Sequence, residues 1–469
     1  MKIILHISYI LTILLGAQSS VNAQIEMSTF HTDKDVINNF SNPASFGNYA
    51  VTVNLPSVMA GYYNNSFKFK EVLIKEDNEL KLHMEELIAR VNQDGLIFQA
   101  NASVETFGVN VQIGDLAVGV NHGVRVINQA FIPKSAIEFL WGGNAQFIDQ
   151  TVDLGIRENL LSYQEFGLRL GYRFENKISV GLRAKMNYGM ASYQTASSVA
   201  SIYTDPEIYQ LTATTDYTLQ VGGLPELNDE DGALFHFENN GGMSTITGDN
   251  KGLAFDLGIV IPVNEKITLQ ASIQNIGKIN WSSDSYAYKS KGEYLFEGLD
   301  LKPLLEEGEI STEQLLDSIS NTFNFESSRS SFSTKLPSTF NVGAQYQIME
   351  NLAAGAFIYS QAFRGVSTSA LGVHIQKSFG STLSVGTQYA LLSGGVHNLG
   401  FTGSLRLGPV NIFVNTDNVL PLFDPLNTQN FNVRVGVNLL FGNLKKREQK
   451  KRKDSKGVED SMSGLDISK

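Results

Sequence analysis

The chain has 469 residues, a formal net charge of −11 and no cysteine. The lack of cysteine excludes disulfides, thiolate metal sites and cysteine nucleophiles, and the acidic balance is a poor match for nucleic-acid binding. The 42 glycines, 28 phenylalanines and 17 tyrosines suit curved sheets with aromatic girdles, and an all-β barrel can use this length as one unit.

Residues 1–23 have the features of an export signal. Lys2 supplies a positive start, residues 3–15 are apolar, and small residues precede Gln24. The apolar run is too short for a helix that spans a membrane. We therefore expect cleavage between Ala23 and Gln24 and an exported mature chain.

The segment after the signal does not have the pattern of a wall strand. Residues 24–47 are mixed and polar, which predicts a periplasmic lead-in or plug. Residues 79–91 have helical spacing, and residues 133–141 predict a second short helix. Helices cannot lie in the wall of a closed sheet, so the first of them is expected to act as a plug or cap.

Residues 178–190 show the pattern that the rest of the chain repeats. Every even position is apolar, and every odd position is glycine or polar. Successive side chains of a strand point to opposite faces, so one face is apolar and the other is polar. These residues span roughly 43 Å, or a height of roughly 33 Å at a tilt of about 40°. This height suits a strand that crosses a bilayer, whereas a soluble strand usually stops after about five or six residues.

The same alternation recurs at regular intervals to the end of the predicted barrel. It is clearest in residues 166–174, 255–261, 267–273, 340–348, 383–389, 399–407 and 431–441. Short turns are expected near residues 114, 175–177, 264–265, 349–351, 380–382 and 408–409. Mostly longer connections are expected on the other side, near residues 127–165, 191–252, 277–335, 392–398 and 419–430.

Outer-membrane barrels have short periplasmic turns and long extracellular loops. Counting back from the last strand on this basis gives eleven wall strands from residues 166–174 onward, and three more fit upstream. We predict an all-β fold, an antiparallel transmembrane β-barrel of about 14 strands (range 12–16) with short plug elements, over residues 48–442. Residues 206–221 and 283–296 break the parity and are assigned to extracellular hairpins or strand extensions.

The end of the chain differs from the barrel. Phe441 resembles the terminal aromatic residue of an outer-membrane assembly signal, which predicts the barrel assembly machinery as a partner. Residues 443–469 follow as a basic, polar, low-complexity run that predicts a disordered periplasmic tail. Such a tail is either a solvated extension or a contact site for an anionic partner or a periplasmic protein.

Motifs of enzyme chemistry are missing from the sequence. There is no paired metal spacing, no hydrolase elbow and no phosphate-binding loop, so neither an enzyme nor a cofactor or metal site is expected.

One cluster of basic residues is expected in the lumen. Arg169, Arg173, Arg183 and Lys185 occupy the polar faces of two strands that one short turn connects. One hypothesis is an ionic network with acidic plug side chains such as Asp33, Asp35, Glu85 or Glu86. The other is a basic constriction that selects anionic solutes.

Several short motifs are similar to those of a known family. These are Asn42-Pro43-Ala44, Gln274-Asn275-Ile276-Gly277, Leu336-Pro337 and a last strand that ends in phenylalanine. Together they resemble the uncharacterised outer-membrane barrels of Bacteroidota, a domain of unknown function that distantly resembles the FadL-type long-chain fatty-acid transporters. The resemblance implies a fourteen-stranded barrel with an N-terminal plug. The lumen-facing positions are rich in Arg, Asn, Gln and Gly, so we expect a polar lumen rather than an apolar ligand path.

Two functions remain open for a barrel in the bacterial outer membrane, surrounded by lipid. The first is a plugged transport barrel for small or amphipathic molecules, with a hydrophobic or anionic small molecule as the ligand. The second is a scaffold or binding barrel that presents its loops or its tail to a secretion or envelope partner, as the related type IX secretion shuttle barrel does.

Overall fold

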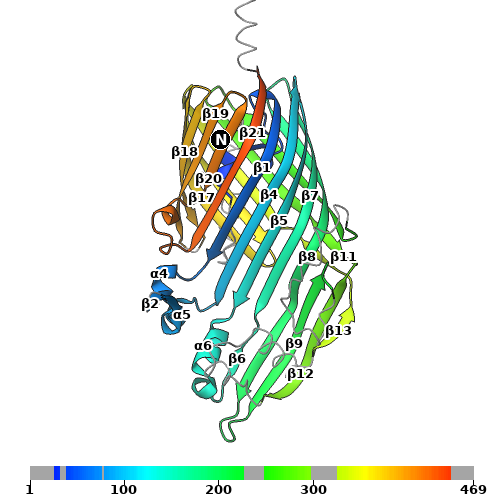
Figure 1. Cartoon of the computed structure of the whole chain (residues 1–469), viewed down its shortest axis with the longest axis vertical. Helices are drawn as coiled ribbons and strands as arrows, with labels where there is room; N and C mark the ends of the chain where they lie inside the picture. Colours follow the sequence, from blue (N-terminus) through cyan, green and yellow to red (C-terminus); the bar gives the residue numbers. More distant parts are fainter. Residues whose placement is uncertain are drawn as a thin grey trace, which may run out of the picture.

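The computed structural model describes residues 26–31, 38–76, 79–225, 248–296, 325–393 and 395–444. Within them, 14 antiparallel strands form a closed barrel, because the first wall strand pairs with both the second and the last (Figure 1). In order around the ring these strands are β1 (Tyr49–Asn64), β4 (Leu96–Ile113), β5 (Leu116–Ile132), β7 (Arg157–Arg173), β8 (Ser179–Thr204), β10 (Lys251–Pro262), β11 (Ile267–Trp281), β15 (Ser338–Met349), β16 (Leu352–Phe363), β17 (Val366–Phe379), β18 (Leu383–Leu392), β19 (His397–Leu407), β20 (Val410–Thr416) and β21 (Asn430–Asn443). The predicted barrel and its strand number are confirmed.

The remaining described elements lie inside the barrel or at its extracellular end. The strands are β2 (Leu73–Glu76), β3 (Glu79–Leu82), β6 (Thr151–Asp153), β9 (Leu211–Gly222), β12 (Ser285–Phe296), β13 (Glu326–Arg329) and β14 (Phe332–Lys335). The helices are α2 (Ser28–His31), α3 (Asn38–Ser41), α4 (Phe69–Val72), α5 (Met84–Arg90), α6 (Lys134–Gly142) and the 3₁₀ turns η1 (Asn144–Phe147) and η2 (Leu420–Leu422). No helix in the described part of the chain has the length and apolar composition that a membrane crossing requires.

The strand at residues 178–190 is longer than its pattern indicated. β8 continues to Thr204 and pairs with β9, which pairs in turn with β12. β8 has one extra residue at two places, at Met190 opposite Ser162 and Tyr163 of β7, and between Thr195 and Ser197 opposite β9. After each irregularity, the residues of β8 that faced inward by their position in the alternation face outward instead. A prediction from strict alternation therefore misses the continuation of the strand. β9 and β12 leave the wall and form a sheet beyond it, as predicted for residues 206–221 and 283–296 (Figure 1).

The outer surface of the barrel is apolar and its inner surface is mainly polar. Large apolar side chains of many wall strands are exposed on the outside, among them Leu168, Val120, Leu257, Val373 and Leu405. The neighbouring positions in sequence point inward and are buried. A belt of exposed aromatic residues, which includes Phe174, Phe379 and Phe441, lies near the end where β21 finishes. Exposed apolar bands flanked by aromatic belts are the lipid-facing surface of outer-membrane barrels.

Every connection between consecutive wall strands at that same end is short. Gly114 and Gly408, each in a two-residue turn, have φ angles of +61° and +63°, which favour glycine. The long connections lie at the opposite end, together with one two-residue turn, Arg364-Gly365 between β16 and β17. By the rule for outer-membrane barrels, the end with only short turns is periplasmic and the end with the long connections is extracellular.

The helix predicted for residues 79–91 is only half right. Residues 79–82 form β3, a hairpin strand paired with β2, and α5 begins only after His83. His83 caps α5, because its Nδ1 accepts a hydrogen bond from the Glu86 N–H at 3.2 Å. The β2–β3 hairpin and α5 lie at the extracellular rim and not in the lumen (Figure 1). The second predicted helix, at residues 133–141, corresponds to α6.

Three parts of the chain named above lie outside the described residues. They are the cleavage site at Ala23 and Gln24, the acids Asp33 and Asp35, and the tail from residue 445 onward.

An arginine on the lipid-facing surface is expected to destabilise the barrel according to its depth. Leu168 lies five residues before the periplasmic end of β7, which places it roughly 13 Å into the membrane. We expect Leu168→Arg to lower the free energy of unfolding by about 2–4 kcal/mol. The control Ile113→Arg, beside a periplasmic turn, should cost only about 0–1 kcal/mol. Urea titration in phospholipid vesicles measures both, and equal losses would contradict the assigned membrane position.

Candidate functional site

The N-terminal segment lies against the inner surface of the barrel wall. We call its described residues, 26–31 and 38–46, the plug. At its centre, Asn42-Pro43-Ala44 forms a tight turn. The Asn42 Oδ1 accepts a hydrogen bond from the Ala44 N–H at 2.9 Å, and the Asn42 carbonyl accepts one from the Ser45 N–H at 3.1 Å. The turn therefore keeps its shape through its own hydrogen bonds.

Two wall glycines provide the space in which this turn sits. A Cβ atom on Gly181 of β8 would lie 2.2 Å from the carbonyl of Pro43, and one on Gly258 of β10 would lie 2.0 Å from the Asn42 Oδ1. Neither distance is possible for real atoms. The close approach of the plug to the wall backbone thus requires glycine at these positions.

Wall side chains bind the plug by its backbone carbonyls. Arg169 Nε donates to the Pro43 carbonyl at 2.8 Å, and Ser272 Oγ donates to the Ser41 carbonyl at 2.8 Å. The other donors to plug carbonyls are Arg169 Nη2 to Ser45, Arg183 Nη1 and Gln274 Nε2 to Phe40, and Gln270 Nε2 to Phe30. At about 1 kcal/mol for each bond, these contacts hold the plug with several kcal/mol and without any covalent link.

The start of the plug is held by two carboxylates. Asp417, in the connection after β20, accepts hydrogen bonds from the N–H groups of Met27 and Ser28 at 2.9 and 2.7 Å. Burial raises the pKa of Asp417 to about 6, so the group is mainly ionised at neutral pH. Glu26 of the plug forms an ion pair with Arg434 of β21.

A buried ionic cluster lines the wall beside the plug. Lys185 Nζ lies 2.9 Å from Asp256 and 3.3 Å from Glu165, and Arg183 lies 3.3 Å from Asp256. Arg125 continues the cluster to Glu165 at 3.6 Å. Arg125 also pairs with Glu105 of β4.

The four basic residues predicted from the sequence are only partly together. Arg169, Arg183 and Lys185 are buried in the lumen, and Arg169 and Arg183 are opposite each other in the β7–β8 pair. Arg173 lies apart, with its guanidinium 4.3 Å from the centre of the Phe46 ring.

The predicted acidic partners of these residues were wrong where the structure describes them. Glu85 and Glu86 belong to α5 at the rim, and Glu86 pairs with Arg90 there. The actual acids, Asp256 and Glu165, come from wall strands. Asp256 stands between Phe255 and Leu257, so its inward position was readable from the alternation.

The pairing leaves little net charge for anion selection. Four cations (Arg125, Arg183, Lys185 and Arg434) form ion pairs with four carboxylates (Glu26, Glu105, Glu165 and Asp256). Arg169 is a fifth cation, and its guanidinium donates to plug carbonyls and to Asn110. The basic constriction expected as one alternative therefore has no strong unbalanced field to act through.

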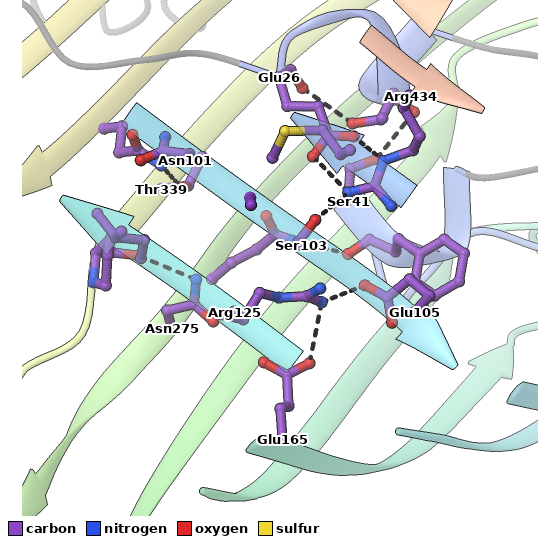
Figure 2. Close-up of a pocket in the computed structure, with 18 of the residues that line it drawn as sticks. Glu26, Ser41, Asn101, Ser103, Glu105, Arg125, Glu165, Asn275, Thr339 and Arg434 are labelled. Carbon is purple, nitrogen blue, oxygen red and sulfur yellow. Dashed lines mark hydrogen bonds and ion pairs between the residues drawn. The ribbon is translucent and has the colours of Figure 1, made fainter. Parts of the chain in front are cut away.

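A cavity of about 160 Å³ lies between the plug and this cluster (Figure 2). Plug residues Glu26, Thr29, Phe40 and Ser41 form one side of it. The wall contributes charged and amide groups together with apolar surface from Met59, Val126, Ile127, Pro337 and Tyr359. An apolar cavity of about 150 Å³ can hold benzene, so this one has room for a small organic molecule.

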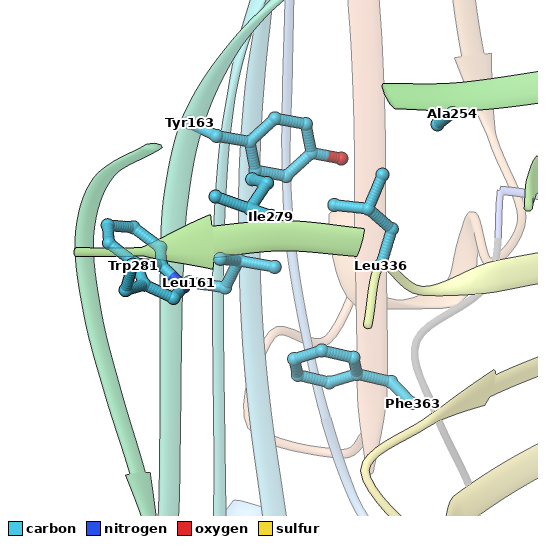
Figure 3. Packing of buried hydrophobic residues seen from close by; sticks show 7 residues of the cluster. All are labelled: Leu161, Tyr163, Ala254, Ile279, Trp281, Leu336 and Phe363. Atoms are coloured by element: carbon cyan, nitrogen blue, oxygen red, sulfur yellow. The ribbon is translucent and has the colours of Figure 1, made fainter. Parts of the chain in front are cut away.

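An apolar cluster lies on the extracellular side of the cavity. It is formed by Leu161, Tyr163, Ala254, Ile279, Trp281, Leu336 and Phe363 (Figure 3). Trp281 is fully buried, stacks on Phe332 with ring centres 6.0 Å apart, and donates from Nε1 to Thr334 at 3.0 Å. The expectation of a polar lumen throughout is wrong for this part.

The alternation pattern predicts this cluster only weakly because β11 changes phase. Asn275 has a φ angle of +59°, and the pairing of β10 with β11 is irregular beside it. Ile273 and Ile276 therefore both face outward, and Ile279 then faces inward. Residues from 277 onward were assigned to a loop for this reason.

Among the described residues, no group of three or more His, Asp or Glu side chains is placed to bind a metal ion.

Comparison with known proteins gives a family but no activity. The family described as "Family of unknown function (DUF5723)" matches residues 43–417. The chain belongs to this family. No curated protein matches the chain.

Among solved structures, this DUF5723 chain is similar to the following three, among others. A Pseudomonas aeruginosa FadL homologue is 11% identical, with 91% of this chain and 100% of that chain covered and a TM-score of 0.43. The Pseudomonas putida toluene transporter TodX is 9% identical, with 90% and 98% covered and a TM-score of 0.43. The Ralstonia pickettii toluene transporter TbuX is 10% identical, with 86% and 92% covered and a TM-score of 0.40.

Removing one carboxylate from the ionic cluster is expected to destabilise the fold strongly. Asp256→Asn leaves Arg183 and Lys185 with an uncompensated buried charge, which costs about 3–5 kcal/mol of unfolding free energy. The matched control is Asp216→Asn, which removes the exposed partner of Lys291 and should leave stability unchanged. Denaturant titration in vesicles measures both variants. Similar stability of the two variants would show that the cluster does not contribute as described.

Proposed function

We propose that this chain is an outer-membrane transport barrel that passes small amphipathic molecules without net charge through a lumen closed by its own N-terminal plug. The observation that carries the proposal is the way in which the plug is held. The plug lies outside the hydrogen-bonded ladder of the wall and packs against Gly181 and Gly258, which we call the glycine seat. Wall side chains bind it through its backbone carbonyls. Its release would therefore open the lumen without breaking any strand pair.

The position in the outer membrane is supported by the outer surface of the barrel. Exposed apolar side chains surround it, aromatic residues lie near one end, and the connections are all short at that end and mostly long at the other. An N-terminal export signal in the sequence agrees with this location.

The class of ligand follows from the lining of the cavity. Ion-paired groups with balanced charge favour solutes that are neutral or zwitterionic, because an extra ionic charge would have no free counter-charge to replace its hydration. The apolar surface of Phe40, Met59 and Ile127 favours an apolar part in the same molecule. Beyond the cavity, the path toward the outside crosses the apolar cluster around Trp281, which favours the same molecules over strongly hydrated ions.

A scaffold role is the second candidate, and one observation favours it. β8, β9, β12 and β13 form a sheet that extends beyond the wall on the extracellular side (Figure 1). A sheet of this kind presents a surface to which a secretion or envelope partner could bind.

Filling the glycine seat is expected to open the barrel. In Gly181→Ala the new methyl group displaces the plug turn, so we expect a higher conductance in planar lipid bilayers than for the unmodified protein. Because the lumen charges are paired, the opened pore should pass anions and cations almost equally. The matched control is Gly171→Ala on the neighbouring strand. Its methyl group would meet Phe46 and the Pro43 carbonyl at an ordinary 3.4 Å, so this variant should stay closed. A Gly181→Ala barrel as closed as the control would contradict the proposed plug.

Deleting residues 445–469 separates the two candidate functions. For a transport barrel, the uptake of a zwitterionic amphiphile into proteoliposomes should be unchanged, because the described barrel ends at Asn443. If the chain acts as a scaffold through its tail, the deletion should instead abolish co-purification of a partner from detergent extracts.

A further inference from the structure

An exposed apolar patch on the extracellular rim belongs neither to the plug nor to the cavity. It consists of Leu80 and Leu82, which share one face of the β2–β3 hairpin, and of Leu140 and Trp141 on α6. We call these four residues the rim patch. Their exposed fractions run from 49% for Leu82 to 58% for Leu80 and Trp141. Tryptophan and leucine exposed to this degree on neighbouring elements are unusual for a surface that faces only water.

The rim patch is carried by a packed unit. α4, α5 and α6 share a small core of Phe67, Val72, Leu87, Val91 and Ile137. Leu96 and Ile132, at the extracellular ends of β4 and β5, pack against this core and anchor it to the wall. The exposure of the patch is therefore a property of a folded unit.

This unit adjoins the lipid-facing surface of the barrel. Val58, Ala60 and Tyr62 form one row on the outer face of β1, in which Val58 is 49% exposed. The Phe69 ring of α4 packs edge-on against Tyr62, with the ring centres 5.4 Å apart. Tyrosine at the end of such a row marks the level where hydrocarbon meets head groups. α4 begins at that level, and the β2–β3 hairpin follows directly after it.

Positive and negative side chains around the rim patch nearly balance, and several of them are paired. Lys81 lies 3.2 Å from Glu76, and Arg90 lies 2.8 Å from Glu86 and 3.2 Å from Glu71. The unit thus presents apolar side chains without a strong field of either sign. A neutral lipid surface fits this chemistry better than an acidic or basic protein partner.

We propose that the rim patch inserts into the outer leaflet of the membrane and that lipid is its occupant. Leucine and tryptophan side chains are those that interfacial elements bury at the boundary between head groups and acyl chains. The contact would extend the lipid-facing surface of β1, β4 and β5 onto the loops. It does not depend on the transport role of the barrel.

The absence of cysteine from the chain makes a direct test possible. The variants Leu80→Cys and Trp141→Cys are each labelled with a single polarity-sensitive fluorophore. They are then reconstituted in vesicles of dioleoyl phosphatidylcholine that contain a nitroxide-labelled phosphatidylcholine as quencher. Two controls define the scale. Val120→Cys, 46% exposed in the outer apolar band, reports lipid contact. Lys291→Cys, with a side chain 77% exposed on the extracellular sheet, reports water.

We expect the nitroxide lipid to quench the probes at residues 80 and 141 at least twofold more strongly than the probe at residue 291, close to the value at residue 120. Aqueous iodide should show the reverse order. Heat-modified migration on gels confirms that each variant is folded. If the rim probes behave like the probe at residue 291 toward both quenchers, the proposal is overturned, and a rim that meets water leaves a protein partner as the occupant to seek.

Discussion

The structure depends on the closure of one sheet. In hydrocarbon no water can satisfy a free backbone N–H or C=O group, so a sheet that crosses a bilayer must have no open edge. Here β1 meets this condition by pairing with β21 on one side and β4 on the other, although Pro56 interrupts its ladder. Closure forces every wall residue to face either lipid or lumen. The alternation of apolar and polar residues in the sequence follows from that requirement.

Closure also creates the problem that the plug and the lumen side chains solve. The inner face carries charged groups that are removed from bulk water, and an isolated charge in such a place is costly. In this chain the wall resolves the problem across neighbouring strands, with Asp256 of β10 between Arg183 and Lys185 of β8. The remaining donors, such as Arg169 and Ser272, are satisfied by carbonyls of the plug. Plug and wall thus complete each other's hydrogen bonds, which explains how a short segment with little regular structure keeps a defined position.

The sequence predicted the fold because each wall strand repeats a two-residue period, which residues 178–190 show without exception. It failed where the period changes phase. The irregularity beside Asn275 moved Ile279 and Trp281 to the inner face, and a fixed alternation assigned them to a loop. The spacing of Leu80 and Met84 suited a helix, yet pairing with β2 made residues 79–82 a strand.

The candidate site was less predictable than the fold, because it depends on contacts between distant parts of the chain. An inward glycine at position 181 is visible in the sequence, but the turn at Pro43 that needs it is not. The basic cluster was visible, whereas its acids were sought in the plug instead of the neighbouring strands. Their inward positions could have been read from the alternation around Phe255 and Phe166.

The central claim is that the plug, seated against the wall, closes the lumen. A reversible lock tests it most directly, since the chain has no cysteine of its own. The Ser272 Oγ lies 2.8 Å from the Ser41 carbonyl, while the Ser41 Oγ donates to the Thr29 carbonyl, so cysteines at both positions lie within reach of a short bis-methanethiosulfonate cross-linker that a reductant cleaves. The account predicts that the cross-linked double variant blocks uptake of a zwitterionic amphiphile into proteoliposomes and that reduction restores it. A cross-linked barrel that passes the solute as fast as the reduced one would contradict the account.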